Sequence, residues 1–376
     1  MPLTTIKINR FKLGLLLITL ALITSACSLS TTSSSQTSTV DNSVFLSTDS
    51  GSIWRPMVNL VSATGRPQVI SDVNVNLMSM DPQDSQAIYL ASYDNGLFYT
   101  YNITNGWNRV TGLPNTTIND VRVDPKNKCL IYAALANRLY NSNDCTRTWN
   151  QIYFDNDPNV SVSAVVIDQY NPRNIYIGTS RGEIVKSIDG GNSWRTIQRM
   201  EEGVSRLIIS PLDSRLIFVA TVKNRIFSFT SSTNTNPNNS ADVEKNFLVE
   251  NWTDLNAVLS DYDLGSNFKD IVVSAKDGFM FLATNKLILR SPDNGITWEN
   301  LKLIAPDKDA VINAIAVNPQ NSLEIYYVTN TTLFHSVDGG VSWSTKNLPT
   351  SRSGRELLID FNNPSNIYLG TVKLKN

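Results

Sequence analysis

The chain has 376 residues, of which 41% are hydrophobic, 9% aromatic and 17% charged. This is enough apolar material for a sizeable core and too little charge for a disordered chain. The 32 Lys and Arg residues nearly balance the 33 Asp and Glu residues, so the basic excess of a non-specific nucleic-acid binder is missing. With one histidine and three cysteines, the sequence favours neither a metal site nor another cofactor.

The first 26 residues predict an export signal. Three positive residues, Lys7, Arg10 and Lys12, precede an apolar run over residues 13–26. This run is shorter than the roughly 20 residues that a membrane-spanning helix needs, and its length is typical of a signal peptide. We therefore expect residues 1–26 to be removed during export.

The end of this run indicates a lipid anchor. Ile23-Thr24-Ser25-Ala26-Cys27 resembles the bacterial lipobox, in which the cysteine is acylated before cleavage, although Thr24 stands where that pattern prefers Leu. The polar stretch that follows would make residues 27–42 a flexible tether carrying the lipidated Cys27. This predicts a membrane-anchored protein on the extracytoplasmic side, in the periplasm or on the cell surface. The alternative is an ordinary cleaved signal with an incidental cysteine.

One eight-residue pattern, Ser-x-Asp-x-Gly-x-x-Trp, recurs along the rest of the chain. It occupies residues 47–54, 187–194, 291–298 and 336–343, and a degenerate copy at 142–149 has Cys145 and Thr146 where the others have a small residue and Gly. Its aspartates suit a tight turn, because Asp accepts hydrogen bonds from nearby backbone amides and Gly allows positive φ. We assign this structural role to Asp49, Asp144, Asp189, Asp293 and Asp338.

The repeat period predicts the fold. Turn residues that follow an alternating apolar strand recur 42–44 residues apart, except for one gap of 64, at Asp81, Asp124, Asp168, Ser210, Ser274, Asn318 and Asn362. The long gap contains a polar, Asn-rich insertion at about 231–250, which we interpret as a surface loop. The seven tryptophans fall one to a unit, giving seven repeats. A period of this length with four short strands is typical of a β-propeller blade.

The two ends of the chain complement each other. The last unit offers only two strands, at about 356–361 and 366–372, whereas residues 43–57 supply a third strand, an octet and a fourth strand. We therefore predict that residues 43–376 form an all-β, seven-bladed propeller of four-stranded antiparallel blades. The N-terminal strands would complete the last blade and close the ring.

The octet resembles the Asp-box, or bacterial neuraminidase repeat, of sialidases, xyloglucanases, sortilin-type propellers and the photosystem II stability/assembly factor family. The phrase Asn-Pro-x-Asn-Ile-Tyr-x-Gly-Thr, at 171–179 and again at 363–371, looks most like the last two groups. The resemblance covers about residues 43–376. It implies a propeller but transfers no activity, because these turns lie away from the sites that propellers build.

The enzyme families in this resemblance fit the residues poorly. Sialidases have six blades and an Arg-Ile-Pro motif that this chain lacks, and xyloglucanases place two aspartates between tandem propellers. A glycosidase needs two carboxyl groups about 5–10 Å apart. The loop carboxylates available for such a pair, which we interpret as solvated charges, are Asp94, Asp155, Asp157, Glu201, Glu202 and Asp263. His335 precedes an octet and is expected on a strand surface.

A binding face is the better supported prediction. Arg138, Arg181, Arg225 and Lys286 fall beside the loop between the second and third strands of successive units. The assembly-factor family is similar in carrying arginines on one face for a partner protein, and guanidinium groups bind carboxylates well. Alternatively, cations are simply tolerated at these exposed turns.

The other two cysteines are expected to pair. Folding the second and third strands about Ala136 brings Cys129 opposite about residue 143, close to Cys145 and near the separation that a disulfide prefers. Export permits oxidation. The alternative is two free thiols.

The sequence thus predicts a lipid-anchored, non-enzymatic propeller that binds or assembles another membrane or exported protein. The runner-up is a carbohydrate-binding or glycoside-hydrolase propeller of sialidase or xyloglucanase type. No nucleic acid is expected as a partner.

Overall fold

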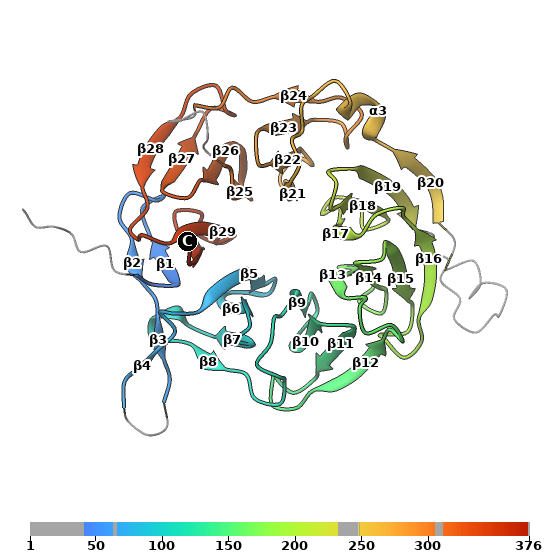
Figure 1. The fold of residues 1–376 in the computed structure, drawn as a ribbon, viewed down its shortest axis with the longest axis horizontal. Coiled ribbons are helices and arrows are strands. Elements are labelled where there is room, and N and C mark those ends of the chain that lie inside the picture. The colour runs from blue at the N-terminus through green and yellow to red at the C-terminus, as the bar shows by residue number, and fades with distance from the viewer. Residues whose placement is uncertain (1–40, 63–65, 232–246, 248, 305–310, 375–376) are drawn as a thin grey trace, which may run out of the picture. The chain divides into compact units, whose positions relative to one another are not determined.

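The computed structural model describes residues 41–62, 66–231, 247, 249–304 and 311–374. The predicted signal peptide, the acylated Cys27 and most of the tether lie outside these residues, as does most of the insertion at 231–250. Seven four-stranded antiparallel sheets surround a central axis (Figure 1). The fold is the predicted seven-bladed propeller.

Each blade has its first strand beside the axis and its fourth at the rim (Figure 1). Blade 1 consists of β5 (Asn74–Asp81), β6 (Asp84–Tyr93), β7 (Leu97–Thr100) and β8 (Asn108–Arg109). Blade 2 consists of β9 (Asp120–Asp124), β10 (Asn127–Leu135), β11 (Arg138–Ser142) and β12 (Asn150–Phe154). Blade 3 consists of β13 (Val162–Ile167), β14 (Ile175–Thr179), β15 (Glu183–Ser187) and β16 (Arg195–Arg199). Blade 4 consists of β17 (Val204–Ile209), β18 (Leu216–Thr221), β19 (Ile226–Ser231) and β20 (Val249–Asp254). Blade 5 consists of β21 (Phe268–Val273), β22 (Met280–Thr284), β23 (Ile288–Ser291) and β24 (Glu299–Asn300). Blade 6 consists of β25 (Ala314–Asn318), β26 (Asn321–Val328), β27 (Thr332–Ser336) and β28 (Ser344–Asn347).

Blade 7 joins the two ends of the described chain. Its sheet has the order β2 (Arg55–Pro56), β1 (Val44–Ser47), β30 (Ile367–Val372), β29 (Ser353–Ile359), and Phe45 pairs with Leu369 across the closure. The inner strand ends two residues earlier than predicted, because the carboxylate of Asp360 accepts the amides of Asn362 and Asn363 and begins the turn there. Asp360, rather than Asn362, is therefore the equivalent of Asp168 in blade 3.

A few short elements lie outside the blades. The hairpin of β3 (Asn59–Leu60) and β4 (Gln68–Val69) lies outside the ring in Figure 1. A 3₁₀ turn, η1 (Ile103–Asn105), replaces the octet in blade 1, and α3 (Asn256–Leu259) follows β20. In the described part of the chain, no helix has the length and apolar character needed to span a membrane.

The core consists of seven apolar clusters, one at each interface between neighbouring blades. Because both faces of a blade pack on neighbours, second strands such as β14 and β22 are buried along their whole length. In β14, a Cβ added to Gly178 would lie 2.4 Å from the side chain of Val204 in the next blade. The Gly of the recurring Gly-Thr phrase thus allows two blades to approach closely.

The octets form the turns between third and fourth strands, as predicted. In blade 3 the Ser187 hydroxyl donates to Asp189 and accepts the Gly191 amide, while Asp189 accepts the amide of Ser193. The degenerate copy keeps this network through Ser142, Asp144, Thr146 and Thr148. These aspartates are structural.

Six of the tryptophans directly precede the fourth strand of their blade. Three of these indoles donate to the backbone of the preceding blade or of the segment that leaves it: Trp107 to Met57, Trp194 to Ile152 and Trp343 to Lys302. Trp252 lies within β20, which starts earlier than the other fourth strands, yet it has the same register. Thr253 after it pairs with Ser228, as Arg195 after Trp194 pairs with Lys186. Trp252 stacks on Phe227 and Phe229. The predicted equivalent position is therefore confirmed in all seven units.

Candidate functional site

The inner strands carry a bulge at the same place in five blades. Near the start of β5, β13, β17, β21 and β29 the pairing with the second strand slips by one residue. Such a bulge redirects the extra side chain. The extra residues are Asn76, Ser163, Ser205, Lys269 and Arg355, and all five line one pocket at this end of the central channel. We call this pocket the channel mouth; its volume is about 280 Å³.

A belt of charged side chains lies just inside the mouth. Arg122 approaches Asp120 to 3.1 Å on β9, and Arg206 of β17 approaches Asp270 of β21 to 3.2 Å. Asp120 is nearly fully buried, and its carboxylate also accepts the backbone amide of Val165 in blade 3. The belt therefore links blade 2 to blade 3 and blade 4 to blade 5 near the axis.

Glu356 of β29 faces the same belt. Its carboxyl forms no hydrogen bond or ion pair within the residues that the structure describes. Burial, together with the nearby charge of Asp270, raises the pKa of Glu356 to about 7, although Arg206 and Arg355 oppose the shift. This carboxyl group can therefore exchange a proton near neutral pH.

Two cations stand at the mouth itself. Arg355 donates to the Tyr93 hydroxyl at 3.1 Å and to Asn76 Oδ1 at 3.4 Å. Across the residues described, the Lys269 ammonium has no hydrogen-bond or ion-pair partner. Burial and the charge of Arg355 lower the pKa of Lys269. An anion placed here would relieve both the desolvation and the repulsion.

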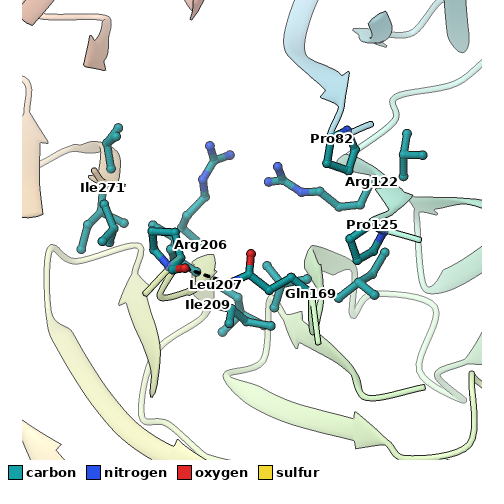
Figure 2. Close-up of a pocket in the computed structure, with 15 residues that line it drawn as sticks. Pro82, Arg122, Pro125, Gln169, Arg206, Leu207, Ile209 and Ile271 are labelled. Atoms are coloured by element: carbon teal, nitrogen blue, oxygen red, sulfur yellow. Dashed lines mark hydrogen bonds between the residues drawn. The ribbon is translucent and has the colours of Figure 1, made fainter. Parts of the chain in front are cut away.

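The opposite end of the channel is apolar. A cavity of about 380 Å³ lies between the inner strands of blades 2 to 5, and Figure 2 shows Arg122 and Arg206 extending toward each other at the open space. A second cavity of about 340 Å³ shares Arg122, Arg206, Val272 and Val273 with it and reaches β25 and β29. We call these two cavities together the lower chamber.

The four cations predicted as a binding face lie at the expected loops, on the same side as the mouth. Three of them are paired locally. Arg181 approaches Asp155 to 2.9 Å, Arg225 approaches Glu201 to 3.1 Å, and Lys286 approaches Asp263 to 2.8 Å. Arg138 lies over the ring of Phe154 instead. The row is therefore present, but most of its charge is already compensated.

The loop carboxylates considered for catalysis are mainly the partners of these cations. Asp157 also approaches Arg181, and Glu202 also approaches Arg225. Asp94 accepts the Thr117 hydroxyl. These carboxylates form rim ion pairs or hydrogen bonds rather than a facing acid–base pair.

The structure also shows the contacts of His335 and of the two cysteines that were predicted to pair. His335 stacks on Tyr326, with ring centroids 4.2 Å apart, and its Nε2 lies 3.0 Å from Glu324. Hydrogen bonding to His335 is the largest cause that lowers the pKa of Glu324 to about 2. Cys129 and Cys145 are placed as a disulfide with Cα atoms 4.1 Å apart. Within the described ranges, no group of three His, Cys, Asp or Glu side chains is placed to hold a metal.

Sequence reasoning missed the charged belt and the mouth. The signal was present, because aligning the units on their turn residue puts Asp120, Arg206, Asp270 and Glu356 four residues before it. At the same position, blades 1, 3 and 6 have the apolar residues Leu77, Ala164 and Ala314. The strands were predicted from the alternation of their apolar residues, and this pattern gives no weight to single charged positions.

The comparisons with known proteins support the architecture. No family model matches the chain, and no curated protein matches its sequence. Solved structures similar to it include the GH74 xyloglucanase of Xanthomonas campestris (14% identity, TM-score 0.61, 80% of this chain and 51% of that one) and the GH74 enzyme of Niastella koreensis (15%, 0.61, 80% and 51%). A structure titled "YCF48 bound to D1 peptide" matches with 15% identity and a TM-score of 0.56, covering 80% of this chain and 94% of that chain. The chain thus spans about half the length of the xyloglucanases and nearly all of YCF48, and the likeness defines a shared propeller fold.

Proposed function

We propose that this protein is a membrane-anchored, non-enzymatic interaction module that binds a carboxylate-bearing segment of another membrane or exported protein at the channel mouth. The observation that carries this proposal is the ammonium of Lys269, which has no partner among the described residues and stands with Arg355 at the mouth. Hydroxyl and amide side chains line this pocket, together with the belt carboxyl groups of Asp120, Asp270 and Glu356. Such a pocket suits an extended peptide, because the cations take a carboxylate and the polar wall pairs with the backbone.

The similarity to YCF48 supports a peptide ligand. That structure contains a peptide, and the match covers nearly the whole of its chain. The paired rim cations, Arg181, Arg225 and Lys286, contribute orientation rather than binding energy, because exposed ion pairs are worth little. The partner's carboxylate is held by Lys269 and Arg355.

The test uses peptide and glycan arrays probed with the mature protein and two matched variants. Lys269→Gln removes the free charge at the mouth. Lys276→Gln removes an exposed lysine from a turn at the other end of the channel. We expect binding to a subset of acidic or free-carboxylate peptides that Lys269→Gln loses and Lys276→Gln keeps. Glycan binding without peptide binding would overturn the proposal.

The anchor forms the second part of the proposal. If Cys27 is acylated, Cys27→Ser should move the protein from the membrane to the soluble exported fraction. Mass spectrometry of the mature N-terminus gives the direct readout. An unmodified Cys27, or cleavage elsewhere, would contradict anchoring without affecting the binding site.

Glu356 keeps a second candidate function open. A buried carboxyl with a pKa of about 7 beside Asp270 has the properties of a general acid with a neighbouring base, and GH74 enzymes share the fold. If the channel were a glycosidase site, the protein would release reducing sugar from xyloglucan and Glu356→Gln would abolish this activity. Absence of hydrolysis by the unsubstituted protein would reject this alternative.

A further inference from the structure

The lower chamber has a different composition from the mouth. Its 380 Å³ cavity is walled by the apolar side chains of β9, β13, β17 and β21 and by prolines of the following turns. This volume lies within the range of about 300–1,000 Å³ that is usual for small-molecule sites. Because the inner strands run the same way along the axis, the chamber and the mouth lie at opposite ends of the channel.

The only charged side chains lining this cavity are Arg122 and Arg206. Asp120, the partner of Arg122, borders the mouth and not this cavity. Arg206 contacts Asp270 through Nε, and its two terminal nitrogens have no hydrogen-bond partner among the residues that the structure describes. Figure 2 shows both guanidinium groups directed into the open space.

We propose that the lower chamber binds a small carboxylate with an aliphatic body. The carboxylate would accept hydrogen bonds from the terminal nitrogens of Arg206 and from Arg122, a geometry that guanidinium groups favour. The aliphatic body would lie against Val166, Ile209 and Val273 of the chamber wall. This site differs from the peptide site proposed at the mouth, although Arg206 borders both cavities.

The second cavity of the chamber also borders Asp270 and Glu356, whereas the 380 Å³ cavity has only arginines as its described charged lining. In the 380 Å³ cavity, charge complementarity therefore selects an anion over a cation or a neutral ligand. Asp120 is paired with Arg122 through Nε and one terminal nitrogen, and Asp270 is paired with Arg206 through Nε alone. The two terminal nitrogens of Arg206 remain for a ligand that enters from the apolar end. The apolar wall excludes small hydrophilic anions, since these gain little from burial there.

Isothermal titration calorimetry with octanoate, below its micelle concentration, tests the chemistry of the ligand. We expect octanoate to bind and butanoate to bind far more weakly, because each buried methylene should tighten binding about fourfold. Octylammonium and octanol, which have the same body without the anion, should bind at least tenfold more weakly than octanoate. Equal binding of octanol and octanoate, or of butanoate and octanoate, would overturn the proposal.

Variants test the location. The double variant Arg206→Gln/Asp270→Asn removes both charges of the ion pair, so that the Asp270 carboxylate is not left buried without its partner. This variant should reduce octanoate affinity at least tenfold. Val273→Asp, which places an acid in the chamber wall, should do the same while retaining Arg206. Lys269→Gln at the mouth should leave octanoate binding unchanged. Retained affinity in both chamber variants, or loss in Lys269→Gln, would place the ligand elsewhere.

Discussion

The guanidinium group of Arg352 donates a hydrogen bond of 2.6 Å to the backbone carbonyl of Val73. These residues lie 279 positions apart in the chain and belong to neighbouring segments of the ring, blade 7 and the entry to blade 1. Arg352 also donates to Ser71 O, Asn74 Oδ1 and Thr371 Oγ1, and it is only 2% exposed. One buried side chain therefore joins the first and last blades at their inner edge.

Replacing Arg352 by Ala should lower the free energy of unfolding by about 3 kcal/mol or more. The loss leaves the carbonyls of Ser71 and Val73 buried without a donor, and each such group costs about 1–3 kcal/mol. Urea unfolding followed by tryptophan fluorescence measures the change. Arg138→Ala, at the exposed start of β11, should change stability by no more than about 0.5 kcal/mol. Equal effects of the two substitutions would contradict the role given to Arg352.

Deleting residues 41–57 should destabilise the propeller strongly, whereas deleting the tether at 28–40 should leave its melting temperature nearly unchanged. The first deletion removes β1 and β2, which pair with β30 and cover the last blade. The exposed strand edge would also promote aggregation. Trp54→Ala, at the octet of the same blade, should cost about 3 kcal/mol. Equal melting temperatures for the two deletions would be inconsistent with closure by the N-terminal strands.

The Cys129–Cys145 pair should remain blocked to alkylation in the native exported protein until a reductant is added. The bond connects the start of β10 with the octet turn that lacks Gly, where Cys145 and Thr146 both adopt positive φ. Replacing both cysteines by Ser should lower the unfolding free energy by about 3 kcal/mol. Mass spectrometry that finds both thiols alkylated without reduction would reject the disulfide.

Glu356→Gln should stabilise the protein more at pH 8 than at pH 4. The folded-state pKa of about 7 lies above the ordinary value of 4.5, so the folded protein holds this proton more tightly than the unfolded chain. Stability from this group is complete below about pH 4.5 and is lost as the pH rises through 7. Glutamine does not titrate and avoids this loss. Thermal unfolding at both pH values, with the exposed Glu201→Gln as control, gives the comparison, and a pH-independent effect would contradict the assigned pKa.

Much of the fold could be predicted because the octets and their spacing encode it. Residues 47–54 complete the last blade as expected, since a tight turn needs Ser, Asp and Gly wherever it occurs. The candidate site was harder to predict from the sequence. Lys269 and Arg355 reach the mouth through bulges, which shift a strand by one residue and are invisible to alternation alone. The pairing of Arg181 with Asp155 joins two loops, and only the structure shows that it compensates the predicted binding cation.

Recognition of a carboxylate at the channel mouth is the central claim, and fluorescence anisotropy tests it directly. The strongest peptide from the array would be labelled and prepared with its acidic groups intact and with those groups amidated. We predict that amidation, or Lys269→Gln combined with Arg355→Gln, weakens binding at least tenfold, whereas Lys276→Gln leaves the affinity unchanged. Equal affinities for the acidic and amidated peptides, or an unaffected double variant, would contradict the account.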